Sequence, residues 1–393
     1  GAALLRVPDT FEALVRLATA ARARAVATRS VAITGSVGKT STKDALRHVL
    51  SAQARTHGAA ASFNNHVGVP VTLARLPRDA TYAVYEIGMN HAGEIAPLVR
   101  MVRPRVAVVT TVSHAHSGNF ADGIEGVARA KSEIFAAGGE VAVVNRDIPH
   151  HDMLAAEARR RGFPSTIGFG EHAAAEFRLV AARPDRGGIA VDADIGGRRL
   201  SYLVGAPGRH WAMNSLAVLA AARALGADME QAAASLATVA APKGRGQQRW
   251  LGPAHARFLL LDESYNANPA SMRAALDVVA GLAPGPCGRR IAVLGDMLEL
   301  GAEAEALHAA LAGPVEAAGI DAAFTCGTLM RGLHDALPGR LRGAHAADSA
   351  ALAAIVAREV RAGDVVVVKG SLSSRMQRVV DALAALDAGH ATA

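Results

Sequence analysis

The sequence is poor in cysteine and aromatic residues and has no long hydrophobic run. Its 393 residues include two cysteines, Cys287 and Cys326, which supply neither a disulfide framework nor the ligand spacing of a metal site. Only 4% of the residues are aromatic, so the stacking platforms that bind single-stranded nucleic acid are scarce. No stretch approaches the roughly 18 consecutive apolar residues of a membrane span, and the first residues do not resemble a signal peptide. We therefore expect a cytoplasmic protein with no membrane or nucleic-acid partner.

Lysine is the other scarce residue. The chain has a formal charge of +7, and its basic residues are scattered along the sequence, which suits an anionic small substrate. Only five of its 42 basic residues are lysine, at positions 39, 43, 131, 243 and 369. A position that keeps lysine in such an arginine-rich chain is a candidate for a task that needs an amine.

The most informative stretch is a glycine-rich turn that follows the apolar run 31–34 and opens a helical pattern. In this layout backbone N–H groups approach phosphate oxygens, Lys39 can bridge the terminal phosphates and Thr40 can offer its hydroxyl to Mg²⁺. The spacing is Gly-x-x-Gly-Lys-Thr, two residues shorter than the common phosphate loop. The alternative to a phosphate-binding turn is an ordinary helix cap that happens to contain a lysine. That interpretation does not explain why the turn lies between a predicted strand and a predicted helix. The predicted nucleotide-binding residues of this turn are Gly35, Ser36, Val37, Gly38, Lys39, Thr40 and Ser41.

The rest of the chain alternates short apolar runs with helical patterns, which predicts two α/β domains. We expect a lead-in helix in residues 1–25, a central domain with a mostly parallel sheet of the phosphate-loop type in 26–242, and a second, Rossmann-like domain in 243–393. Residues 177–204 indicate a small antiparallel patch inside the central domain. The expected parallel strands are 31–34, 82–87, 106–112, 141–145, 258–261, 291–294, 322–325 and 365–368.

Ligands of such sheets bind beyond the carboxyl ends of the strands, so the polar residues there are candidate site residues. Glu86 follows the second strand and can ligate the Mg²⁺ that Thr40 contacts; otherwise it is a solvated strand end. His116, after the third strand, is a candidate ligand or a surface residue. Lys131 is a surface amine or, if its pKa is depressed, an amine that forms a carbamate with CO₂. Asn214 is an adenine-reading amide or a helix-start amide.

The glycine-rich turn and the sequence motifs around the candidate residues together resemble the Mur ligase family, which consists of ATP-dependent amide-forming enzymes of peptidoglycan synthesis. The phosphate loop and the segment 130–134 are family-wide features. Three strings, in 64–70, 264–269 and 295–301, resemble the members that join D-alanyl-D-alanine to UDP-N-acetylmuramoyl-tripeptide. The resemblance implies that phosphorylation by ATP turns the tripeptide carboxylate into an acyl phosphate, which the dipeptide amine then attacks.

The resemblance also assigns roles to single residues. It implies catalytic roles for Lys39, Lys131 and His116. Thr40 and Glu86 would hold one Mg²⁺, while His116 and carbamoylated Lys131 would serve a second. Asn214 would read adenine, Asp262 or Glu263 would hold the ribose, and Arg245 would meet the nucleotide from the hinge. The implied substrate-binding residues are Asn65, Asn90, His91, Tyr265, Asn266, Asn268 and Lys369.

Two departures from the family pattern stand out. The usual N-terminal domain that grips the uridine nucleotide has no room in residues 1–25, so we expect either a trimmed chain or a homologue that holds its acceptor differently. Leu372 stands where an arginine is common, which puts the contacts of the second substrate in doubt. Rival interpretations are a sister ligase with another amino acid or acceptor, a Mur-type ligase outside cell-wall synthesis, and a nucleotide-binding module without ligase activity. No interface signature is present, so a monomer is expected.

Overall fold

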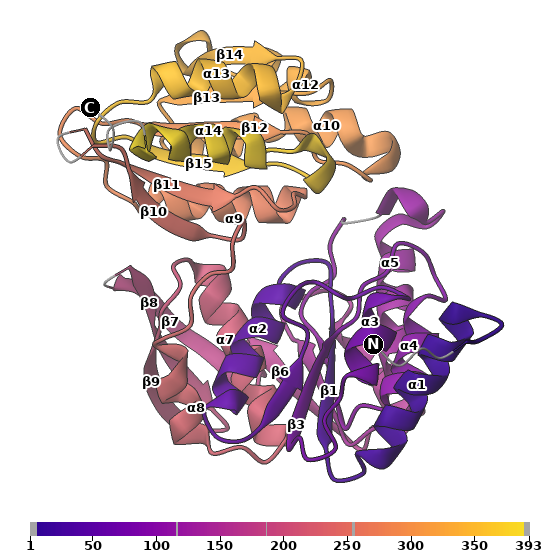
Figure 1. Cartoon of the computed structure of the whole chain (residues 1–393). Coiled ribbons are helices and arrows are strands. Elements are labelled where there is room, and N and C mark those ends of the chain that lie inside the picture. Colours follow the sequence, from indigo (N-terminus) through magenta and orange to yellow (C-terminus); the bar gives the residue numbers. More distant parts are fainter. Residues whose placement is uncertain (1–5, 115–116, 186, 254–255, 389–393) are drawn as a thin grey trace.

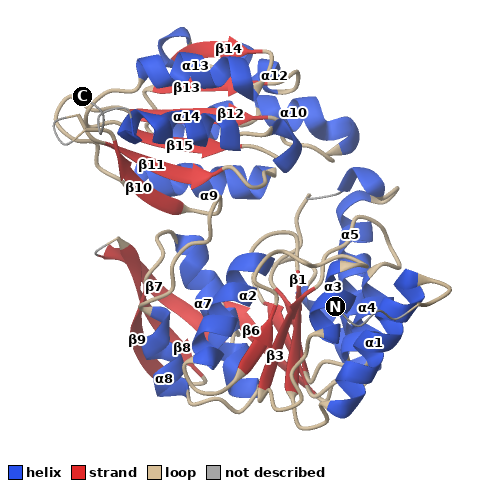
Figure 2. Cartoon of the chain, viewed as in Figure 1, coloured by secondary structure: helices blue, strands red, loops and turns tan. Residues whose placement is uncertain are grey.

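The structure, a computed structural model, describes residues 6–114, 117–185, 187–253 and 256–388. Two lobes follow each other along the chain, and each consists of a twisted sheet flanked by helices (Figures 1 and 2). Within the described residues the first lobe holds a nine-stranded sheet and the second a six-stranded sheet. The predicted α/β class, with a large mostly parallel sheet and a second smaller one, is confirmed.

The larger sheet is parallel through its first seven strands and ends in an antiparallel ribbon. Its predicted antiparallel patch exists, but it continues the main sheet beyond β6 instead of forming a separate one. The strands, in spatial order, are β2 (Thr56–Gly58), β3 (Tyr82–Glu86), β1 (Arg29–Thr34), β4 (Val106–Val109), β5 (Val141–Asn145), β6 (Ser165–Gly170), β7 (Phe177–Asp185), β8 (Gly188–Ile195) and β9 (Arg198–Val204).

Helices cover both faces of this sheet, because side chains that alternate along a strand are apolar on both sides. Val31 and Ile33 of β1 pack into one core, and Ala32 between them packs into the other. On the first face lie α2 (Lys39–Ser51), α7 (Arg209–Ala224) and α8 (Met229–Leu236). On the second lie α1 (Thr10–Arg24), α3 (Gly68–Ala74), α4 (Ile95–Val102), α5 (Gly123–Ser132) and α6 (His151–Arg160).

The smaller sheet repeats this plan, with one antiparallel edge strand, β10. Valines 365–368 alternate between its two cores in the same way. Its strands, in spatial order, are β10 (Gln247–Leu251), β11 (Phe258–Glu263), β15 (Val365–Lys369), β12 (Arg290–Gly295), β13 (Ala322–Cys326) and β14 (Arg342–Ala346). One face carries α9 (Pro269–Ala280), α10 (Ala304–Ala309), α11 (Ala312–Ala317) and α12 (Met330–Ala336), and the other carries α13 (Ser349–Glu359) and α14 (Gln377–Ala388).

All eight predicted parallel strands form, although two of them end earlier than expected, at Glu86 and Val109. Strands β2, β6, β10 and β14 were not predicted. They are short, or polar, or lie near sheet edges, and the apolar pattern that identifies a strand is weak there. The predicted lead-in helix is α1, whose first turn is capped by Asp9: its carboxylate accepts a hydrogen bond from Glu12 N at 2.6 Å.

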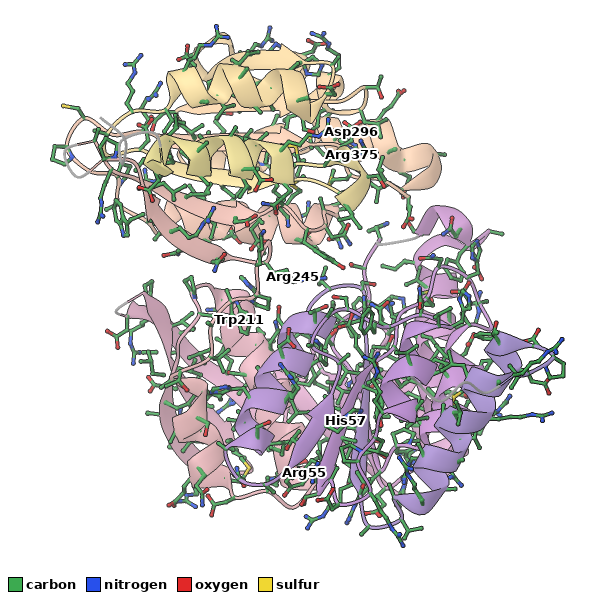
Figure 3. The ribbon with its side chains drawn as sticks, in the orientation of Figure 1. Arg55, His57, Trp211, Arg245, Asp296 and Arg375 are labelled. Carbon is green, nitrogen blue, oxygen red and sulfur yellow. The ribbon has the colours of Figure 1, made fainter. Side chains whose placement is uncertain are left out.

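The chain passes from the first lobe to the second between the end of α8 at Leu236 and the start of β10 at Gln247. Figure 3 places Arg245 in this connection, between the two lobes. None of the helices in the described residues is both long enough and apolar enough to cross a bilayer.

Candidate active site

The turn between β1 and α2 is held in place by the end of the neighbouring strand β4. Thr110 Oγ1 donates a hydrogen bond to Val37 O at 2.6 Å, and Ser36 N donates to Thr111 O at 2.8 Å. A Cβ on Gly35 would lie 1.9 Å from Thr110 Oγ1, and Gly35 has a φ of +151°. Only glycine therefore lets the turn pass this close to the strand.

The first turn of α2 is open toward ligands. Gly38 takes the N-cap position with a φ of 83°, no side chain caps the helix, and the first turn has no acidic residue. Backbone N–H groups and the positive end of the helix dipole are thus free to meet an anion. Lys39 Nζ folds back and donates to Gly35 O at 2.6 Å, so its ammonium lies over the turn.

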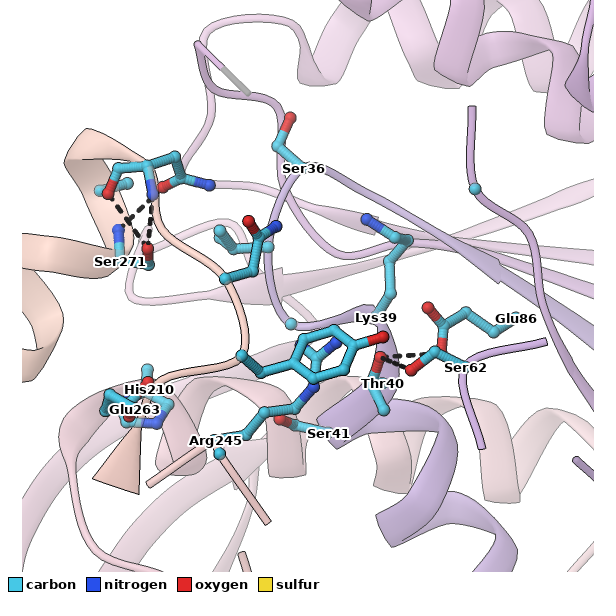
Figure 4. A pocket seen from close by; sticks show the side chains of 18 of the residues that line it. Ser36, Lys39, Thr40, Ser41, Ser62, Glu86, His210, Arg245, Glu263 and Ser271 are labelled. Atoms are coloured by element: carbon cyan, nitrogen blue, oxygen red, sulfur yellow. Dashed lines mark hydrogen bonds between the residues drawn. The ribbon is translucent and has the colours of Figure 1, made fainter. Parts of the chain in front are cut away.

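A compact group of oxygen and amide side chains lies beside this helix end. Thr40 Oγ1 donates to Glu86 Oε2 at 2.9 Å, and Asn64 Nδ2 donates to Glu86 Oε1 at 2.7 Å. The hydroxyl groups of Ser62 and Thr40 are 3.4 Å apart (Figure 4). Glu86 is only 4% exposed, and the two bonds fix both of its oxygens. We name Thr40, Ser62, Asn64 and Glu86 the oxygen corner.

The oxygen corner opens into a cavity of about 320 Å³ that both lobes line. The first lobe, which lies below in Figure 1 and is called the lower lobe, contributes the turn between β1 and α2 and the oxygen corner. The second, upper lobe contributes the segment after β11, the first turns of α9 and the end of β15. Of the predicted site residues, the cavity is lined by Ser36, Val37, Gly38, Lys39, Thr40, Ser41, Glu86, Asn90, Asn214, Arg245, Glu263, Tyr265, Asn266, Asn268 and Lys369.

The cavity is lined by three cationic side chains and two carboxylates, namely Lys39, Arg245, Lys369, Glu86 and Glu263. Burial lowers the pKa of Lys39, with opposing contributions from Glu86, which raises it, and Arg245, which lowers it. Burial and the charge of Lys39 together hold the pKa of Lys131 well below its usual value. Lys131 is 1% exposed. A bound anion would offset the burial that disfavours the charged form of Lys39, so the cavity favours an anionic ligand.

The upper wall is built around a buried ion pair. Lys369 Nζ lies 3.2 Å from Glu263 Oε2 and donates to Asn266 O at 2.9 Å. His210, from the first turn of α7, faces this pair: burial lowers its pKa most, the Glu263 carboxylate raises it and Lys369 lowers it. Asn268 lines the cavity, and its side chain also caps α9 by accepting from Ser271 N at 2.9 Å.

The connection between the lobes is tied to the upper lobe. Gly246 N donates to Asp262 O at 2.8 Å, and Tyr265 N donates to Gly244 O at 3.1 Å. The guanidinium of Arg245 stacks 4.0 Å from the centre of the Tyr265 ring. Arg245 is thereby held in the cavity wall at the point where the lobes meet.

A second contact joins the lobes on the far side of the cavity. The short helix η1 (Ser117–Asn119) meets η3 (Gly301–Glu303), with Gly118 N donating to Glu299 O at 3.4 Å. A Cβ on Gly118 would lie 2.6 Å from Gly301 N. His114 Nδ1 lies 3.6 Å from Glu303 Oε2 beside them. The two backbones touch this closely because neither glycine has a side chain.

Five predicted residues in the described chain do not line the cavity. Gly35 lies behind the turn. Asn65 is exposed, and its side chain accepts from Gly68 N at 2.9 Å at the start of α3. His91 is exposed beside Glu94. Asp262 is fully buried and accepts from Ser264, so of the alternatives Asp262 and Glu263 only Glu263 reaches the cavity. The fifth is Lys131, buried in α5; His116 lies outside the described residues.

Several lining residues were missed. Asn64 and Ser62 belong to a loop that apolar periodicity does not locate, but the Asn-Asn pair was already part of the string that suggested Asn65. His210 belongs to the string that suggested Asn214. The other lining residues that the prediction omitted are Gly88, Met89, Gly244, Ala270, Ser271 and Ala274.

Comparison with known proteins agrees with this architecture. The sequence matches the Mur ligase middle domain over residues 33–222 and the domain described as "Mur ligase, glutamate ligase domain" over residues 251–372. It is 37% identical over 390 residues to the UDP-N-acetylmuramoyl-tripeptide--D-alanyl-D-alanine ligase of Escherichia coli, covering 96% of this chain and 82% of that one. The chain belongs to the Mur ligase family.

Other relatives of this Mur ligase agree. The ligase of the same name from Rickettsia prowazekii is 30% identical over 380 residues, which cover 96% of this chain and 83% of the relative. A crystal structure of MurF from Acinetobacter baumannii superposes with a TM-score of 0.85 at 28% identity, covering 97% of this chain and 82% of that one. The resemblance to the family is thereby confirmed, and with it the ligase class of the enzyme.

The buried Lys131 predicts an unusual dependence of stability on pH. Its pKa is depressed in the folded state, so between that value and about 10.4 the unfolded chain binds a proton that the folded chain does not. Stability therefore rises with pH through this window. Lys131→Met has no amine that must lose its proton on folding. We therefore expect its free energy of unfolding to exceed that of the wild type at about pH 7, and the difference between the two proteins to shrink toward about pH 10.

The measurement is the urea unfolding midpoint of both proteins across this pH range, in buffer freed of CO₂. Lys243→Met, at an exposed lysine, is the matched control and should show no such trend. A gap between Lys131→Met and wild type that stays constant with pH would contradict the prediction.

Proposed function

We propose that this chain joins D-alanyl-D-alanine to UDP-N-acetylmuramoyl-tripeptide, using ATP, in the synthesis of peptidoglycan precursors. The observation that carries the proposal is the cavity between the lobes. It combines an uncapped helix end, a lysine-bearing turn and the oxygen corner of one lobe with a polar wall from the other. The names of the relatives that share most of this chain support the choice of substrates. We expect a cytoplasmic monomer.

The chemistry explains why a triphosphate site is needed. A carboxylate is a poor electrophile, and its oxygen is a poor leaving group at neutral pH. Transfer of the γ-phosphoryl group of ATP to the terminal carboxylate of the tripeptide gives an acyl phosphate and ADP. The amine of D-alanyl-D-alanine attacks the acyl carbon, the C–N bond forms, and phosphate leaves. The enzyme's contribution is positioning and electrostatic stabilisation.

The lower lobe is suited to the triphosphate. Residues 36–41 line the cavity from an uncapped helix end, and Lys39 lies over the turn. The oxygen corner fits Mg²⁺, which takes one or two protein oxygens and completes its shell with phosphates and water. Thr40 and Glu86 would hold the ion, and it would neutralise charge on the phosphoryl oxygens. In the described residues no group of three or more His, Cys, Asp or Glu side chains is arranged to hold a metal ion.

Lys131 is suited to carbamate formation. Its buried amine has a depressed pKa, and a neutral amine can attack CO₂ to give a carbamate with release of a proton. The carbamate is an anion of carboxylate type, and it would place a negative charge beside the ammonium of Lys39. His116, which would act with it, lies outside the described residues.

Helix α7 of the lower lobe, the upper lobe and the connection complete the site. Asn214 on α7 lies against the turn, since a Cβ on Gly38 would be 2.8 Å from Asn214 Oδ1, and we assign it to the adenine. Glu263 is assigned to the ribose, and Arg245 to the nucleotide phosphates. Tyr265, Asn266, Asn268, Lys369 and, from the lower lobe, Asn90 are assigned to the peptide substrates. Because residues of both lobes line one cavity, turnover requires that the lobes close.

The deciding experiment is phosphate release from ATP by the purified protein, measured with each substrate omitted in turn. We expect release to depend on both the uridine-linked tripeptide and D-alanyl-D-alanine, with the pentapeptide product identified by mass. Release that depends on a different amino acid, such as glutamate or a diamino acid, would replace the proposal by a sister ligase. Release that is independent of both peptide substrates would contradict ligase activity.

Lys131→Ala tests the carbamate. Its removal takes away an anion at the phosphoryl end, and we expect turnover to fall by at least about a hundredfold. Added formate or acetate should restore part of it, because a free carboxylate can occupy the vacated space. Turnover that is unchanged in Lys131→Ala would remove the carbamate from the mechanism, and a loss without rescue would reduce Lys131 to a structural lysine.

Gly118→Ala tests lobe closure. The added methyl group would lie 2.6 Å from Gly301 N, and Gly118 has no positive φ, so the effect is steric and falls on this contact between the lobes. We expect kcat to fall about tenfold or more, since displacements near 1 Å cost this much in positioned reactions, with unchanged thermal stability. Gly313→Ala, where a Cβ meets nothing within 4 Å, is the control. Equal kcat in the two variants would contradict a closed reactive state with this contact.

A further inference from the structure

Lys43 has no task in the proposed mechanism, although it is one of the few lysines that the sequence keeps. It lies in the second turn of α2, its side chain is completely buried, and it does not line the cavity. A buried ammonium is costly unless its hydrogen bonds are satisfied. Its partners therefore show what it does.

The ammonium group has three donors, and each has an acceptor within 3.5 Å. Lys43 Nζ donates to Asp44 Oδ1 at 2.6 Å, to Ala59 O at 3.1 Å and to Ala61 O at 3.5 Å. Asp44 provides the counter-charge, and the two carbonyls belong to a different part of the chain. A planar guanidinium cannot reproduce this three-pronged arrangement, which accounts for a lysine here among so many arginines.

The two carbonyls belong to segment 59–64, which follows the short edge strand β2. Ala60, Ala61 and Phe63 of this segment are exposed, so apolar packing does little to fix it. The same segment brings two members of the oxygen corner, Ser62 and Asn64, to Thr40 and Glu86. Its last residue also accepts a hydrogen bond from Gly88 N at 2.8 Å through Asn64 O.

We propose that Lys43 is a positioning residue: it fastens segment 59–64 to the phosphate-binding helix and so sets the geometry of the oxygen corner. The inference rests on the proposed function in one respect: it takes the oxygen corner as the part of the site that binds Mg²⁺ and the triphosphate. Helix α2 then serves the ligand twice. Its first turn faces the phosphates, and its second turn holds the loop that orients Glu86.

The consequence of losing the amine follows from these contacts. Lys43→Met keeps the apolar stem, and the side chain of Asp44 is 24% exposed, so its carboxylate can be hydrated when the ammonium is gone. The fold should survive, whereas the carbonyls of Ala59 and Ala61 lose their common donor. Ser62 and Asn64 then no longer hold one position beside Glu86.

The test compares Lys43→Met with Arg47→Met. Arg47 lies one turn further along α2, and its side chain approaches Gly58 of β2 instead of the carbonyls of segment 59–64. Two measurements need no peptide substrate: amide hydrogen exchange of the ligand-free protein, and the Mg²⁺ dependence of binding of a non-hydrolysable ATP analogue. For Lys43→Met we expect at least about tenfold faster exchange in 59–64 and at Gly88, and about tenfold more Mg²⁺ for half-maximal binding, as for other residues that orient metal ligands.

Two outcomes would overturn the proposal. In the first, Lys43→Met and Arg47→Met show the same rate of amide exchange in 59–64 and need the same Mg²⁺ concentration for half-maximal binding. The other is faster exchange that extends equally to the core of α7, because this would make Lys43 a residue of general stability. Lys43→Arg keeps the positive charge, and we expect it to shift both measurements in the same direction as Lys43→Met. Wild-type values in Lys43→Arg would contradict the claim that the three donors of an ammonium group are needed at this position.

Failure of the proposed function would be visible separately. If the wild-type protein releases no phosphate with the two peptide substrates while Lys43→Met still loosens segment 59–64 and weakens magnesium-dependent nucleotide binding, the substrate assignment falls and the role of Lys43 stands.

Discussion

The close approach of the turn 35–38 to the end of strand β4 is the constraint on which the site depends. Thr110 bonds to Val37 O, and no side chain fits at Gly35. This contact fixes the turn, the turn fixes the start of α2, and an uncapped helix end with Lys39 above it follows. The oxygen corner and Lys43 are both built onto the same helix. A small error at Gly35 would therefore be transmitted to each group that faces the triphosphate.

The second constraint is that neither lobe has a complete site. The lower lobe offers amide donors, cations and the oxygen corner, while the wall that faces them comes from residues 263–274 and from Lys369. The lobes are joined through the connection at Arg245 and through the Gly118–Gly301 contact on the opposite side. Closure brings the charged groups of the two lobes to one ligand, and in the proposed reaction it would shield the acyl phosphate from water.

The features that could be predicted from the sequence are those encoded by residues close together in the chain. A strand that is buried on both faces is a continuous apolar run, so β1, β3, β4, β5 and the central strands of the second sheet could be predicted, as could the turn with its glycine and lysine spacing. Prediction failed at β2 and β14, which lie at sheet edges, and at Ser62, because a loop that follows an edge strand has no periodic pattern. Asp262 and Glu263 are adjacent and chemically alike, and side chains alternate along a strand, so one of them must point away from the cavity. Only the tertiary structure shows that Glu263 lines the cavity and Asp262 is buried.

The amino-acid sequence by itself determined the fold class, the glycine-rich turn with its lysine and the likeness to the Mur ligases, because these depend on residues that are neighbours in the chain. The tertiary structure decided which polar residues face one another. Lys43 meets the carbonyls of residues 59 and 61, Asn64 meets Glu86, and Gly118 meets Gly301, although each pair is separated by 16 to 183 positions. Such contacts arise from strand order and lobe docking, which bring distant segments together, and no local pattern of residues encodes them.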